Sequence, residues 1–177
     1  MRTRTILARA AVSTSAAALV VLLLLGGAQP AAAAGIEPVE GQFVTTVTPD
    51  GCTSPLGLCT VGTIEGGLEG AVRVTFLTTA PASQAPPWLR LLLSDAVIAE
   101  DTVYYTADIV IDSPAGSFRG DIQGLVTFSA GSLESLVTLD DGDGVYRNAR
   151  AALLASGTPS VSGPETLRYE GVLIGRR

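Results

Sequence analysis

The sequence contains neither histidine nor lysine in its 177 residues. Without histidine, a Ser-His-Asp triad, a Cys-His pair and any histidine-ligated zinc, iron or copper site are excluded. Without lysine, Schiff-base catalysis and a Walker-type phosphate site are also excluded. Any catalysis must therefore use carboxylates, tyrosines, arginines or the backbone, and we expect no cofactor.

Long apolar runs are rare, and the one that stands out lies near the N-terminus. Three arginines precede the run from Ala16 to Ala28, and Ala32 to Ala34 provide the small residues that a signal peptidase needs. This pattern predicts a secretory signal peptide over residues 1–34, with cleavage before Gly35. The alternative is a membrane anchor, but the run is too short to cross ~30 Å of hydrocarbon as a helix.

Positive charge is scarce after residue 34. All 17 acidic residues lie there against 8 arginines, which gives a net charge near −9. Such a surface repels phosphate backbones and anionic lipids, so we expect neither a nucleic-acid partner nor membrane binding after cleavage. The charge is typical of a soluble exported protein.

Cysteine is also scarce, with only Cys52 and Cys59 present. Their spacing is too long for a CxxC redox motif, and histidine is not available to complete a metal site. An exported chain meets an oxidising environment, so we expect one local disulfide with a structural role.

Runs of β-branched and apolar residues, separated by glycine, proline and aspartate, predict seven or eight strands and no long helix. Gly120 and Gly124 fall inside these runs, where residues without a side chain permit the coiling that barrel closure requires. We therefore expect residues 35–177 to form one all-β domain, a single antiparallel β-barrel, with a two-sheet sandwich as the alternative. The predicted strands are Gln42–Thr48, Thr60–Glu65, Gly70–Thr79, Val103–Asp112, Phe118–Phe128, Leu133–Leu139, Ala151–Ser156 and Leu167–Ile174.

The stretch from Trp88 to Ala99 is ambiguous because its leucines fit either a short helix or an apolar strand. We predict a strand with an irregular start. Trp88 follows two prolines and could cover one end of the barrel or line an opening there.

Several short motifs resemble the barrel family of allene oxide cyclases and dirigent proteins. Residues 142–150, GDGVYRNAR, resemble the GTGxFRxARG turn of plant dirigent proteins, and residues 116–121, GSFRGD, resemble the preceding strand. Residues 52–62, CTSPLGLCTVG, and the YEG at 169–171 are similar to uncharacterised secreted bacterial members of the group. The resemblance implies an eight-stranded barrel, often trimeric in dirigent proteins. It also implies that acidic, arginine and tyrosine side chains inside the barrel steer phenoxy radicals.

The same resemblance assigns two site residues. The arginine that ends the dirigent turn falls on Arg150, and the second residue of the turn falls on Asp143. Asp143 stands where the family has threonine, and Ala151 stands where it has glycine.

Further candidates lie on the predicted strand Val103–Asp112. Asp108 and Tyr104 share one face, whereas Tyr105 belongs to the apolar face. If Asp108 points into the barrel, burial would raise its pKa and suit it to acid or base catalysis; if it points outward, it is a solvated strand residue. Tyr104, Tyr105 and Tyr146 could each donate to an oxygenated ligand or fill the core.

Arg119, Arg147 and Arg150 lie near turns that would rim the barrel. Together they could bind a ligand carboxylate, or each could form a salt bridge with an aspartate or glutamate on the surface. Asp108, Asp143 and Arg150 are thus the catalytic candidates, and Arg119 joins the tyrosines as a candidate ligand contact.

The acidic run from Asp140 to Gly144 could suggest calcium, but it lacks the further ligands and the closing glutamate of an EF-hand loop. We interpret it as a turn and expect no metal site.

Three functions fit this sequence. The first is a secreted barrel that binds an apolar or phenolic small molecule in its interior or mouth without turning it over. The second is a dirigent- or cyclase-like catalyst that positions a reactive intermediate. The third is a structural or interaction module of the cell envelope. We expect binding rather than catalysis, and the sequence leaves homo-oligomerisation open.

Overall fold

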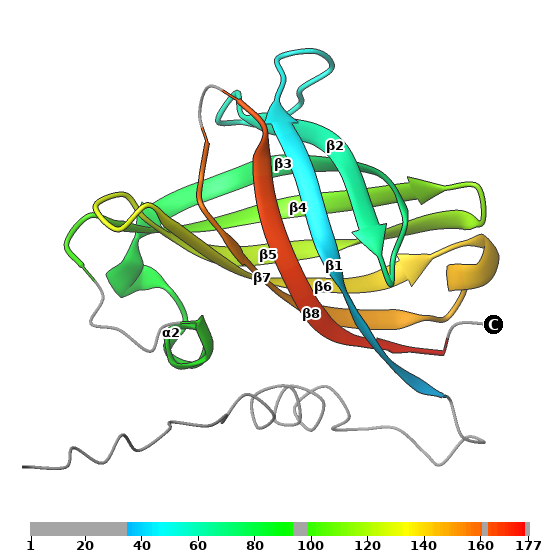
Figure 1. Ribbon diagram of the computed structural model, residues 1–177. Coiled ribbons are helices and arrows are strands. Elements are labelled where there is room, and N and C mark those ends of the chain that lie inside the picture. The colour runs from blue at the N-terminus through cyan, green and yellow to red at the C-terminus, as the bar shows by residue number, and fades with distance from the viewer. Residues whose placement is uncertain (1–34, 94–98, 161–162, 176–177) are drawn as a thin grey trace, which may run out of the picture.

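The computed structural model describes residues 35–93, 99–160 and 163–175, so the predicted signal peptide lies outside the described residues. The described chain forms one closed barrel of eight antiparallel strands in sequence order (Figure 1). The predicted all-β single barrel is confirmed, and the sandwich alternative is wrong. The strands are β1 (Ile36–Val47), β2 (Cys59–Gly66), β3 (Gly70–Pro81), β4 (Thr102–Ser113), β5 (Gly116–Thr127), β6 (Ser132–Gly142), β7 (Arg150–Gly157) and β8 (Glu165–Ile174).

The barrel closes where the first strand pairs with the last. β1 and β8 run antiparallel from the Ile36–Ile174 pair to the Thr45–Glu165 pair. Closure leaves no strand of the barrel with a free edge. Gly120 lies at a register shift between β5 and β6, where an added Cβ would come within 1.8 Å of the carbonyl oxygen of Thr138. A residue without a side chain is therefore required at this close approach.

Inward-facing side chains fill most of the barrel with one apolar core. Three aromatic pairs pack within it, and their ring centroids are 4.9 to 5.3 Å apart. The alternation along each strand decides which residues take part, because successive side chains point to opposite faces. The pairs are Phe43 with Tyr169, Phe76 with Tyr105, and Phe118 with Tyr146.

The prediction of a strand after residue 88 is wrong over its described part, because Pro87–Leu93 forms a helix, α2. Proline suits the first position of a helix, since its fixed φ is already helical and its missing N–H is not needed there. Leu89 and Leu93, four residues apart, are buried, whereas Leu91 between them is 83% exposed. A strand would have placed all three on one face. Residues 94–98 of the predicted strand lie outside the described residues.

The helix packs on the outside of the barrel (Figure 1). Its buried leucines join Ala82 of the short 3-10 turn η1 (Ala82–Gln84) and cover Leu125 of β5 and Leu136 of β6. This second, smaller core explains why β6 is apolar on both faces near Leu136. No helix among the described residues is long and apolar enough to cross a membrane.

Candidate functional site

The two ends of the barrel differ in their connections. At one end, which we call the disulfide end, lie the loop from Thr48 to Leu58, the connection that carries α2, and the turn between β5 and β6. At the other end, the far end, lie the β2–β3 and β4–β5 turns and the 3-10 turn η2 (Gly144–Tyr146) before β7.

A small cavity of about 40 Å³ lies inside the barrel near the disulfide end. Most of its wall is apolar, and five polar side chains interrupt it. The apolar walls include Phe43, Val74, Phe76, Ile109 and Ile122, and the polar residues are Thr45, Thr60, Tyr105, Ser135 and Glu165.

Glu165, the first residue of β8, is the most unusual group in this cavity. The residue is partly buried, and its Oε1 atom has almost no accessible surface and no hydrogen-bond partner among the described residues. Burial raises the pKa of the Glu165 carboxyl from 4.5 to about 7, because taking a carboxylate out of water disfavours its charged form. Near neutral pH the carboxyl is therefore present in both protonation states.

Tyr105 of β4 supplies the second polar group. Its hydroxyl lies 2.5 Å from the Ser135 hydroxyl of β6, and either oxygen can be the donor. Burial raises the pKa of the Tyr105 hydroxyl, and the charge of Glu165 raises it further. Tyr105 therefore stays protonated at neutral pH and is held toward Ser135.

Sequence reasoning missed Glu165 and Ser135, although a signal for each was present. Inward positions of β8 include Tyr169 and Leu173, which are both buried, and the period of two extends back to Glu165. The predicted strand begins at Leu167, two residues too late, and therefore does not include Glu165. Ser135 takes an inward position between Leu133 and Val137 in the same way.

The structure places Asp108 on the outer surface of the barrel. It is exposed and pairs in register with Thr75 and Asp121 of the neighbouring strands. The condition for acid or base catalysis, burial inside the barrel, is therefore not met. Tyr104 also points outward, packs near α2 and donates a hydrogen bond of 3.3 Å to Oε1 of Gln123.

The resemblance-derived candidates lie at the far end. Asp143 is exposed and accepts hydrogen bonds from the backbone N–H of Ser117 (2.7 Å) and its hydroxyl (3.0 Å), which lower the pKa of the Asp143 carboxyl. This pattern anchors the β6–β7 connection against β5. Arg150 is exposed at the start of β7, and Tyr146 is buried against Phe118.

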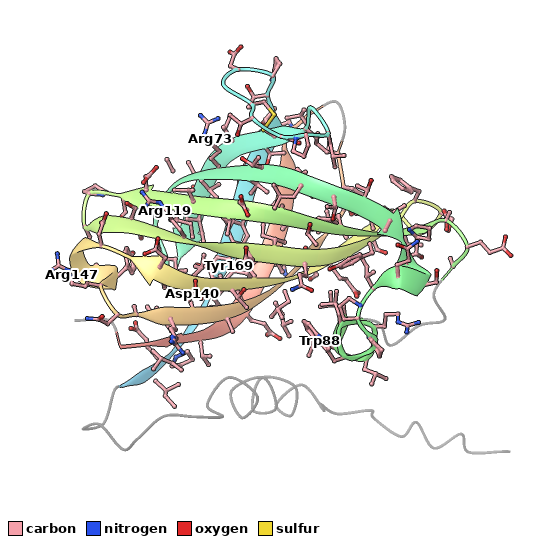
Figure 2. The ribbon with its side chains drawn as sticks, turned by 180° about the vertical axis from the view of Figure 1, so that it is seen from behind. Arg73, Trp88, Arg119, Asp140, Arg147 and Tyr169 are labelled. Atoms are coloured by element: carbon pink, nitrogen blue, oxygen red, sulfur yellow. A yellow bond between two sulfur atoms is a disulfide. The ribbon has the colours of Figure 1, made fainter. Side chains whose placement is uncertain are left out.

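Arg119 and Arg147 also lie at the far end, away from Trp88 and α2 (Figure 2). Arg119 lies 3.8 Å from the carboxylate of Asp141, with both side chains more than half exposed. Such a surface pair contributes little to stability. The structure therefore brings neither arginine nor Asp143 to the cavity, and only Tyr105 of the sequence candidates lines it. Trp88 is 46% exposed on α2, outside the barrel.

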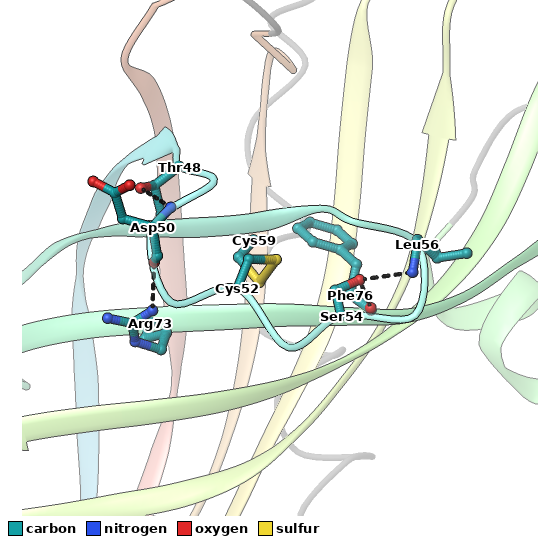
Figure 3. The surroundings of a disulfide bond; sticks show 8 residues. All are labelled: Thr48, Asp50, Cys52, Ser54, Leu56, Cys59, Arg73 and Phe76. Carbon is teal, nitrogen blue, oxygen red and sulfur yellow. Dashed lines mark hydrogen bonds between the residues drawn. A yellow bond between two sulfur atoms is a disulfide. The ribbon is translucent and has the colours of Figure 1, made fainter.

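The predicted disulfide between Cys52 and Cys59 is present, with the two Cα atoms 5.6 Å apart. It closes a loop that lies against the middle of β3, beside Arg73 and Phe76 (Figure 3). The Ser54 hydroxyl donates to the carbonyl of Phe76, whose N–H donates to the carbonyl of Leu58 at 3.1 Å. Because Phe76 also lines the cavity, the loop holds one cavity wall in place.

A larger groove of about 940 Å³ lies on the outer face, between α2 and the β1–β8 seam. Its polar lining includes Glu40, Glu65 and Glu170, which are all exposed. It is an open, solvated surface. No group of three or more Cys, Asp or Glu side chains in the described part of the chain is arranged to hold a metal ion.

Neither a protein-family model nor a curated protein sequence matches this chain.

Proposed function

We propose that this is an exported binding protein that takes one end of an apolar or phenolic small molecule at the disulfide end of its barrel. The observation that carries the proposal is the Oε1 atom of Glu165, which is buried beside an apolar cavity without a hydrogen-bond partner. Buried polar groups in native proteins are normally paired, so an unpaired one next to a cavity suggests a missing ligand. The predicted signal peptide and the disulfide support export.

The size of the cavity limits the pose of the ligand. Small-molecule pockets usually measure about 300 to 1,000 Å³, whereas this cavity measures about 40 Å³. It has room for a few atoms, so the tip of the ligand would enter and the remainder would lie outside the cavity, at the disulfide end.

A structural module without a ligand is the second candidate. It is favoured by the filled interior, where side chains from all eight strands leave little free volume. The dirigent-like alternative has weaker support, because Asp108, Asp143 and Arg150 are all exposed and lie outside the cavity.

The proposal can be tested with toluene, an apolar probe, and with a variant that fills the cavity. Ala155 is buried on β7 and lines the cavity, so Ala155→Leu would occupy its free volume. Ala71→Leu on the exposed face of β3 is the matched control. Toluene titration followed by amide chemical shifts should perturb residues around the cavity in the wild type and in Ala71→Leu. Ala155→Leu should lose these perturbations.

If neither toluene nor phenol shifts the amides around the cavity of the wild type, the proposal is overturned and the structural module is favoured. Shifts that persist in Ala155→Leu would also overturn it. Native mass spectrometry of protein from the culture medium of its source adds an independent readout. We expect a chain that begins at Gly35 and carries a small retained mass.

A further inference from the structure

We infer that the barrel cavity selects molecules that carry a hydrogen-bond donor, such as the hydroxyl of a phenol or an alcohol, and that Glu165 is the group that selects them. This inference rests on the proposed function and adds the chemical class of the ligand.

The acceptor is present, and no described neighbour satisfies it. Oε1 of Glu165 is shut off from solvent without a hydrogen-bond partner. The nearby Tyr105 and Ser135 hydroxyls are bonded to each other. A buried acceptor that makes no hydrogen bond costs free energy, and a hydrogen-bond donor on a ligand would recover it. A purely apolar ligand would leave that cost in place.

The same wall disfavours acidic ligands. Glu165 and Tyr105 are the only titratable side chains among the described residues that line the cavity, and no arginine is among them. A ligand carboxylate would therefore face the Glu165 carboxylate with no cation to compensate. Neutral molecules that carry a hydrogen-bond donor therefore fit both the polar and the apolar parts of the cavity wall.

The protonation of Glu165 makes the preference for donor ligands depend on pH. Its pKa of about 7 places the change of charge near neutrality, and Tyr105 is the titratable neighbour facing it in the cavity. Hydrogen bonds to an ionised acceptor are stronger than those to a neutral one. Preference for a donor ligand should therefore increase as the pH rises through about 7.

Phenol and toluene provide the test, because they have the same shape and differ in one donor group. Their dissociation constants would be measured for the wild type, Glu165→Leu and the control Glu170→Gln, whose exposed side chain lies outside the cavity on the same strand. In Glu165→Leu we expect toluene to bind still, while the phenol-to-toluene ratio of dissociation constants rises about tenfold, the effect of losing one hydrogen bond to a charged group. Glu170→Gln should leave the ratio unchanged.

Should Glu165→Leu fail to fold, Glu165→Gln keeps a neutral acceptor and should abolish the dependence of the ratio on pH. Toluene and phenol that both fail to bind the wild type would overturn the proposed function itself. If both bind and their ratio is the same in Glu165→Leu, or equally pH-dependent in Glu165→Gln, the binding function stands and the inference about donors is wrong.

Discussion

The hydroxyl groups of Tyr105 and Ser135 lie 2.5 Å apart in the barrel interior, although their strands, β4 and β6, are not neighbours. The strand between them is β5, and its Gly124 pairs in register with both residues. An added Cβ on Gly124 would come within 2.5 Å of the Tyr105 ring. Because Gly124 has no side chain, the Tyr105 ring can lie across β5 and its hydroxyl can reach Ser135.

The same arrangement occurs at the seam of the barrel. Tyr169 of β8 lies over Gly41 of β1, where an added Cβ would be 2.7 Å from the tyrosine oxygen. Its hydroxyl accepts a hydrogen bond from the N–H of Leu68 (3.0 Å) and lies 3.2 Å from the carbonyl of Glu65. Two tyrosine–glycine pairs thus connect strands that do not pair directly.

Gly124→Ala should destabilise the protein. The new methyl group would overlap the Tyr105 ring, and overpacking of this kind costs about 1 to 3 kcal/mol of unfolding free energy. Chemical denaturation measures the loss. Gly163→Ala is the control because an added Cβ there would lie 3.7 Å from the Ser160 hydroxyl, an ordinary van der Waals contact. If the clash is the cause, the loss should be much smaller when Gly124→Ala is introduced into a Tyr105→Leu background. An equal loss in both backgrounds would contradict this explanation.

Glu165 should make the protein less stable as the pH rises from about 4.5 to about 7. Its pKa is higher in the folded protein than in the unfolded chain, so the folded state holds the proton more tightly, and this contribution is lost as the carboxyl ionises. Denaturation of the wild type and Glu165→Gln across this range should show the wild type losing stability relative to the variant. The hydrogen bonds from Ser117 lower the pKa of the Asp143 carboxyl, so its titration does not fall in this range. Parallel pH profiles would show that burial of Glu165 is not the cause.

Removal of the disulfide should lower stability and loosen the cavity wall. Cys52→Ser with Cys59→Ser opens a short loop, for which loop entropy predicts a loss of roughly 2 to 3 kcal/mol. The amide of Phe76, which bonds to Leu58 of that loop, should exchange faster with solvent. Amide exchange of Ile111 on β4, away from the loop, serves as the internal reference. Unchanged exchange at Phe76 would show that the loop does not support the cavity.

Sequence patterns predicted the strands well because alternation is a local property. Spacing alone predicts Tyr105 and Ala107 on one face of β4 and Asp108 on the other. The structure confirms this, because Tyr105 and Ala107 are buried and Asp108 is exposed. The helix at Pro87–Leu93 was missed because a run of leucines fits both periods, and the burial of Leu89 and Leu93 depends on Leu125 and Leu136. Those two partners come from other strands, which local spacing cannot reveal.

By itself, the sequence determined the chemistry available to this protein, which has no histidine or lysine and only two cysteines, seven residues apart. It also determined the alternating pattern of the strands and the glycines that fall inside them. These are properties of composition and short-range spacing. Only the tertiary structure decided which strand faces meet inside the barrel, and therefore that Tyr105, Ser135 and Glu165 share one cavity. The physical reason is closure: β1 must pair with β8 before inside and outside are defined, and that pairing joins residues more than a hundred positions apart.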